Sequence, residues 1–189
     1  MTSNLSLAAR VISEGFLPAR SALLQGPREP VSGPVSPSRI RGMLLGLAIG
    51  DALGNTSESL SARERAVRYG EIRDYLPNSR SAGHRVGLPS DDSQLAFWTL
   101  ESLLERGGLD PDDLSARFAS REIFGIGKSM QQFLRNREQG AESWYHYGAE
   151  SAGNGALMLI APLALLHPQG TSAALFLDVA MTSINTHRD

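Results

Sequence analysis

The chain has 189 residues, of which 41% are hydrophobic and 20% are charged, and its formal net charge is −2. This length is enough for one domain with a real core and some additional tail. The near-neutral charge gives no reason to expect a nucleic acid or an anionic membrane as partner. The chain has no cysteine, which excludes disulfides and thiolate metal sites.

We expect a cytoplasmic protein. No apolar run approaches the ~20 residues that a bilayer requires, and the N-terminus lacks the positively charged start of a secretory signal.

Residues 1–38 differ in composition from the rest of the chain. The stretch 25–38 holds four prolines, separated largely by glycine and serine. Such a segment buries too little apolar surface to order itself. We therefore predict a disordered arm and linker over residues 1–38, with a weak helix over residues 11–24 as the alternative.

Helical periodicity begins near residue 39. Five apolar residues recur at i, i+3, i+4, i+7 and i+8 and so share one helical face: Ile40, Met43, Leu44, Leu47 and Ala48. The same segment carries a glycine every four residues, at 42, 46, 50 and 54. Each glycine costs about 1 kcal/mol of helix propensity relative to alanine. We therefore expect this stripe to approach another backbone or a ligand closely, and tight packing between helices is the simpler of the two explanations.

Signals for further helices follow along the chain. Ser90 is a suitable N-cap for a helix that ends at Gly107, and Asp110 followed by Pro111 marks another helix start. Residues 128–137, 156–166 and 172–184 also have helical character, and Pro162 is expected to kink or divide the second of these. No alternating strand of useful length is present. The sequence thus predicts an all-α domain over residues 39–189.

Two acidic motifs could carry chemistry. Asp51 interrupts an apolar run, where a buried carboxylate is costly without a partner, so it either bonds a nearby backbone or belongs to a site. Ser90, Asp91 and Asp92 offer a hydroxyl and two carboxylates, the hard oxygen ligands that Mg²⁺ prefers. The same three residues are also ordinary helix capping, and on this motif alone capping is the simpler interpretation.

Two glycine-containing segments could contact a ligand. The run Ser-Ala-Gly-Asn-Gly at 151–155 precedes an apolar helix, whose first N–H groups suit a phosphate, with a plain turn as the alternative. The Gly-Ile-Gly-Lys-Ser run at 125–129 is similar to the end of a phosphate-binding P-loop. However, the earlier glycine of that motif is missing and no strand precedes it. This excludes a nucleotide triphosphatase site but leaves a possible ligand loop.

Taken together and in this order, the motifs resemble the ADP-ribosylglycohydrolase family. Residues 41–54 are similar to the family's opening helix, and Glu58 matches a glutamate that follows it. Residues 90–93 are similar to its Thr-Asp-Asp-Thr metal motif, with serine in place of threonine. The Gly-Asn-Gly loop and Thr186-His187 also have counterparts, so the resemblance spans residues 39–189.

The resemblance implies a compact, all-helical, magnesium-dependent hydrolase that removes ADP-ribose from a modified side chain. The implied ligands of Mg²⁺ are Ser90, Asp91 and Asp92, and the implied catalytic residues are Glu58 and Asp92. The implied substrate-binding residues are Gly125, Ile126, Gly127, Gly153, Asn154, Gly155 and His187. The implied partner is ADP-ribose or an ADP-ribosylated protein.

The sequence departs from the family pattern in two places. Leu159 stands where members usually have an arginine, and the family's second metal motif, an Asp-x-Asp-Thr-like run beyond the Thr-His pair, is absent. The alternative function is therefore a catalytically inactive module that binds ADP-ribose or another protein. We also expect that a domain without the family's C-terminal part exposes an apolar face and self-associates through it.

Overall fold

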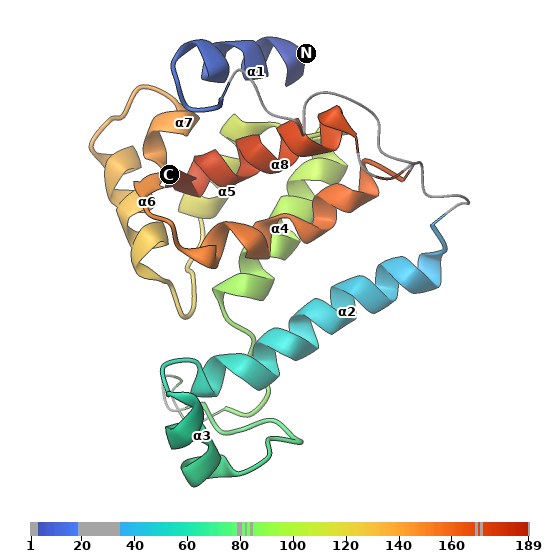
Figure 1. Cartoon of the computed structure of the whole chain (residues 1–189), viewed down its shortest axis with the longest axis vertical. Coiled ribbons are helices and arrows are strands. Elements are labelled where there is room, and N and C mark those ends of the chain that lie inside the picture. Colours follow the sequence, from blue (N-terminus) through green and yellow to red (C-terminus); the bar gives the residue numbers. More distant parts are fainter. Residues whose placement is uncertain are drawn as a thin grey trace.

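The computed structural model describes residues 4–18, 35–78, 81, 83, 85–168, 170 and 172–188. Its main body is a group of packed helices (Figure 1). In chain order these are α4 (Asp91–Arg106), α5 (Pro111–Ala119), α6 (Lys128–Glu138), α7 (Trp144–Tyr147) and α8 (Ala173–Thr186). The predicted all-α fold is confirmed.

A second part of the molecule projects from this body. Helix α2 (Pro37–Gly54) leads through the 3₁₀ helix η2 (Asn55–Ser57) into α3 (Ala62–Tyr69), which lies in a small lobe at the lower end of Figure 1. From there the chain returns past an isolated bridge between Pro77 and Val86 to the start of α4. The junction of α2, the lobe and α4 is where the acidic motifs come together.

Local capping explains several helix ends. Asp110 accepts hydrogen bonds from the backbone N–H groups of Asp112 and Asp113, with Pro111 in the first turn, as predicted. Gly107 ends α4 with a left-handed φ of 69°, which glycine adopts without strain. These signals lie within a few residues of the ends that they determine, which is why the sequence predicts them well.

The segment after residue 153 differs from the prediction. A helix over 156–166 is wrong in detail, because the chain forms two 3₁₀ helices, η3 (Asn154–Leu159) and η4 (Ala161–Leu165). Pro162 lies in the first turn of η4, where its missing N–H is harmless, and so divides the segment. Two short strands, β1 (Ala149–Glu150) and β2 (His187–Arg188), pair in parallel and place Ala149 opposite His187. This pairing was not predicted.

The hydrophobic core lies between α4, α5, α6 and α8. Its largest fully buried apolar side chains include Phe118, Phe133, Leu95, Leu114 and Met181. The aromatic cluster of α7 belongs to this core, since Trp144 and Tyr145 are each only 2% exposed. The N-terminus of α4 and the loop before α6 therefore rest on a packed support.

Part of the segment predicted to be a disordered arm, residues 1–38, is helical in the structure. Residues Asn4–Ser13 form helix α1, whose Ala8 and Val11 are buried in the main core. Tyr145 Oη donates a hydrogen bond of 3.0 Å to Glu14 just after the helix. The apolar face of α1 is too short to stand out beside the proline-rich stretch, and it becomes stable only by packing against the body. The predicted linker at 19–34 lies outside the described residues.

Helix α2 does not use its glycines for close helix packing. Among the described residues, a Cβ added at any glycine of the 42, 46, 50 and 54 stripe would meet nothing within 4 Å, so the packing explanation is wrong for this part of the chain. Leu45 and Ile49 are 53% and 45% exposed, and self-association through this face stays a prediction. Within the described part of the chain, no helix has the length and apolarity to cross a membrane.

Replacing Gly46 with alanine is expected to stabilise the fold. The new methyl group meets open space, and the unfolded chain loses conformational freedom, so the gain is about 0.5–1 kcal/mol. Urea unfolding followed by circular dichroism measures this difference. A loss of stability instead would mean that the face is covered in solution, for example by a second copy of the chain.

Candidate active site

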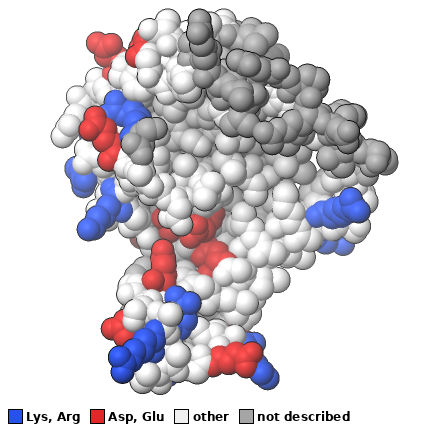
Figure 2. Space-filling model, viewed as in Figure 1, with Lys and Arg blue, Asp and Glu red and all other residues white. Residues whose placement is uncertain are grey.

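A cavity of about 640 Å³ opens where the end of α2, the start of α4, the loop before α6 and the loop before η3 meet. Its acidic lining residues are Asp51, Glu58, Asp91 and Asp92. Figure 2 shows acidic atoms gathered where the helical body meets the lobe of α3. Gly125, Gly127, Gly153, Asn154, Gly155 and His187 line the same cavity. Nearly all the predicted site residues are thus brought together.

Asp51 is the centre of a hydrogen-bond network at this cavity. Its Oδ2 accepts from Ser90 N at 2.7 Å, Ser93 N at 3.1 Å and Ser93 Oγ at 2.6 Å. Its Oδ1 accepts from Ser90 Oγ at 2.7 Å and Asn55 Nδ2 at 3.1 Å. Asp51 therefore caps the start of α4 from a position 39 residues earlier, which combines the two interpretations that the sequence left open.

This network changes the role predicted for Ser90. Ser90 is the N-cap residue of α4, but its side chain makes no capping hydrogen bond to the helix. The hydroxyl instead donates to Asp51, which leaves the lone pairs of Ser90 Oγ available to another partner. Burial raises the pKa of Asp51, but hydrogen bonds from Ser93 and Ser90 outweigh it and hold this pKa below the usual value. Asp51 is therefore a charged acceptor at neutral pH.

Asn55 extends the network into the lobe. Its side-chain amide donates to the Leu88 carbonyl at 2.8 Å, and its Oδ1 accepts from Asn78 Nδ2 at 2.9 Å. Both asparagines are buried. The chain that returns from the lobe is thus held against the end of α2 immediately before it enters α4.

Asp91 and Asp92 lie side by side in a partly buried setting. Burial, followed by the charge of Asp92, raises the pKa of Asp91 to about 6. Burial, followed by the charge of Asp51, raises the pKa of Asp92, and the exposed Glu58 adds to this effect. Several carboxylates thus repel one another around the cavity, and a bound cation would relieve this repulsion.

The loop before α6 lies directly on the start of α4. Gly125 has a φ of 79°, and a Cβ there would come within 3.1 Å of Ser90 Cβ, so both conformation and space favour glycine. Gly127 N donates to Asp91 Oδ2 at 3.3 Å. Ile126, predicted to contact substrate, is partly buried against the hydrophobic core and is not among the residues that line the cavity.

His187 forms the opposite side of the cavity. It is buried, its Nδ1 lies 2.9 Å from Thr186 Oγ1, and burial lowers its pKa, so it is neutral at pH 7. A Cβ on Gly155 would come within 2.9 Å of the His187 ring, which explains the glycine by close approach. Gly153 has an ordinary φ of −68°, so its backbone conformation does not require glycine.

Sequence reasoning missed several lining residues. Arg65 of α3 and Met158 line the cavity, although neither was among the predicted site residues. Only the return of the lobe brings Arg65 close, and no local pattern marks it. Leu159, which stands at the family's arginine position, is fully buried in the core.

Comparison with known proteins agrees with this geometry. The sequence profile described as ADP-ribosylglycohydrolase matches residues 33–189. The chain is 32% identical over 139 residues to the ADP-ribosyl-[dinitrogen reductase] glycohydrolase of Rhodospirillum rubrum, covering 71% of this chain and 47% of that protein. It is 27% identical over 169 residues to an ADP-ribosylarginine hydrolase of Pseudomonas putida, covering 80% of this chain and 42% of that protein.

The chain spans less than half the length of these curated relatives. The matched segment nevertheless contains α2, the acidic start of α4, both glycine loops and His187. The chain belongs to the ADP-ribosylglycohydrolase family.

Proposed function

We propose that this protein hydrolyses the glycosidic bond between ADP-ribose and a modified protein side chain, with Mg²⁺ as cofactor. The observation that carries the proposal is the Asp51 network, which fixes Ser90 and Ser93 at the start of α4. The two carboxylates that follow Ser90 line one cavity together with Glu58 and both glycine loops. The names of two relatives, a glycohydrolase and a hydrolase acting on ADP-ribosyl groups, support the same reaction class.

Magnesium fits the donors at the start of α4. Ser90 Oγ has uncommitted lone pairs, and Asp91 and Asp92 add carboxylate oxygens whose mutual repulsion favours a cation. These three residues would hold the ion. Among the described residues no group of three or more His, Cys, Asp or Glu side chains is arranged to hold a metal. Waters and ligand hydroxyls would therefore have to supply the remaining ligands. When bound, Mg²⁺ supplies charge stabilisation and a template for oxygen ligands.

The chain's own residues supply the remaining steps. Glu58 is exposed at the cavity, where its carboxylate takes a proton from the attacking water or gives one to the leaving group. The neutral His187 ring and the adjoining Gly153–Gly155 backbone form a wall that orients the ribose.

Calorimetry with Mg²⁺ and ADP-ribose tests this proposal through Asp92→Asn. We expect magnesium-dependent binding by the wild type and its loss, by about tenfold or more, in the variant. The matched control is Asp112→Asn, which also removes a carboxylate from the first turn of a helix but lies in α5, outside the cavity. Equal affinities for wild type and Asp92→Asn would contradict the metal role, because helix capping alone affects stability and not ligand binding.

The second candidate is an ADP-ribose-binding module without hydrolase activity. It is favoured because, in the part of the chain that the structure describes, no three His, Cys, Asp or Glu side chains are grouped to hold a metal ion. Binding of ADP-ribose without turnover of ADP-ribosyl-arginine supports this candidate, whereas turnover that is lost in Asp92→Asn supports the enzyme.

A further inference from the structure

Three cavities follow one another along the surface. The acidic cavity shares Lys128 and Ser129 with a second cavity of about 480 Å³. The second shares Glu150, Ser151 and Arg188 with a third of about 440 Å³. The three cavities are therefore neighbours, and the first of them holds the carboxylates proposed to act in catalysis.

The middle cavity is cationic. Lys128, Arg135 and Arg188 line it, and Glu150 is its single acidic lining residue, with a side chain 89% exposed and 4.0 Å from Arg188. Lys128 is the only lysine of the chain, and it forms no ion pair among the described residues. The Oγ atoms of Ser129 and Ser151, 3.0 Å apart, add hydroxyl groups at its edge. Ammonium, guanidinium and hydroxyl groups together suit phosphate oxygens.

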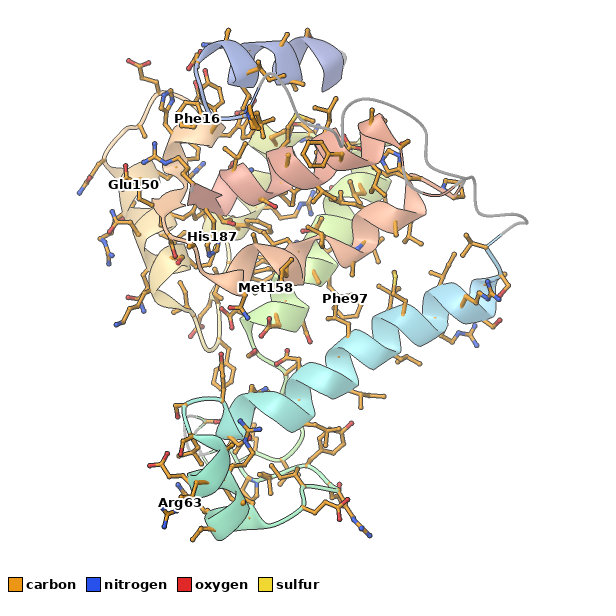
Figure 3. All side chains as sticks on the ribbon, viewed as in Figure 1. Phe16, Arg63, Phe97, Glu150, Met158 and His187 are labelled. Carbon is orange, nitrogen blue, oxygen red and sulfur yellow. The ribbon has the colours of Figure 1, made fainter. Side chains whose placement is uncertain are left out.

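The far cavity has an aromatic wall from the N-terminal segment. Phe16 lines it together with Arg188, whose guanidinium lies 5.8 Å from the centre of the Phe16 ring. Phe16 is held by edge contacts with Tyr145 and His146, at 5.3 and 5.2 Å between ring centres. In Figure 3, Phe16, Glu150 and His187 come from different elements along one side of the molecule. Aromatic rings and guanidinium planes are the groups on which nucleobases stack.

We infer that Lys128 and Phe16 recognise the diphosphate and the adenine of an ADP-ribosyl ligand whose terminal ribose occupies the acidic cavity. The order of the cavities, acidic, cationic and aromatic, matches the order of ribose, diphosphate and base in such a ligand. Phe16 lies outside residues 33–189, which match the family profile, so the aromatic wall comes from a segment that the family match does not include. The inference rests on the proposed function.

Affinity measurements with Mg²⁺ and two ligands test the inference. Phe16→Leu keeps an apolar side chain but removes the ring, and we expect about tenfold weaker binding of ADP-ribose with unchanged binding of ribose 5-phosphate, which has no base. Lys128→Gln removes an exposed charge and is expected to weaken ADP-ribose binding by about tenfold, while the circular dichroism spectrum stays that of the wild type.

Leu17→Ala is the matched control, because Leu17 packs on the core from the same segment without lining the cavity. It should bind ADP-ribose as the wild type does. Equal weakening by Leu17→Ala and Phe16→Leu would mean that both residues act only through the packing of the N-terminal segment on the core. This result would overturn the role of the ring. Wild-type affinity in both Phe16→Leu and Lys128→Gln overturns this inference alone. A wild-type chain that binds no ADP-ribose overturns the proposed function as well.

Discussion

Replacing Gly148 with alanine should destabilise the fold by about 3 kcal/mol, at the upper end of the range for overpacking. The new Cβ would overlap the carbonyl oxygen of Ile184 and lie 2.9 Å from Arg188 Cγ and 3.2 Å from His187 N. Gly148 has an ordinary φ of −55°, so the constraint is one of space. The pairing of β1 with β2 begins at the next residue and prevents the backbone from moving away.

Urea unfolding compares Gly148→Ala with Gly46→Ala as its control. Both variants add one methyl group, but the first meets backbone atoms and the second meets open space, so their effects should have opposite signs. A Gly148→Ala variant as stable as the wild type would mean that the crossing between the end of α8 and residue 148 is looser than the structure shows.

Replacing Asp51 with alanine is expected to cost about 3 kcal/mol of stability and to remove Mg²⁺ binding. The change leaves the donors of Ser90, Ser93 and Asn55 without their acceptor, and hydrogen bonds to a charged group are among the strongest. Without Asp51, the Ser90 hydroxyl keeps only Asp92 Oδ2, at 3.3 Å, as an acceptor, and this oxygen belongs to another of the proposed Mg²⁺ ligands. Urea unfolding measures the first effect, and calorimetry with Mg²⁺ measures the second.

Asp74→Ala is the control for Asp51→Ala. Asp74 is an exposed carboxylate of the lobe, and its hydrogen bond comes from the adjacent Tyr75 N. Its removal should change neither stability nor Mg²⁺ affinity appreciably. Ser93→Ala, which removes one of the hydroxyl donors, should fall between the two. Undiminished Mg²⁺ affinity in Asp51→Ala would show that the network is structural only.

Helix ends and the composition of the site could be predicted because their signals are local. Asp110 and Pro111 mark the start of α5, and Gly107 marks the end of α4. Each of these signals acts on backbone groups only a few residues away. The acidic motif at 90–92 and the two glycine loops could be recognised as a set because each keeps its own short pattern. Their meeting at one cavity is observed only in the folded chain.

The remaining features depend on contacts between distant segments. Ser93 lies 42 positions from Asp51, and Tyr145 lies 131 positions from Glu14, so no periodicity indicates either pair. Helix α1 owes its order to such contacts, which is why composition alone predicted disorder there. Arg65 likewise lines the acidic cavity, and Phe16 lines the far cavity, only because separate segments of the chain fold back onto the helical body.

The hydrogen bonds of Asp51 also constrain how this sequence can evolve. Removing the carboxylate first leaves the two serine hydroxyls and N–H groups without an acceptor, while removing the serine hydroxyls first leaves a half-buried charge with fewer donors. Each single substitution is therefore unfavourable, although a simultaneous replacement of all three residues need not be unfavourable. Positions 51, 90 and 93 should consequently vary together among descendants of this chain, as one inherited unit that joins two helices.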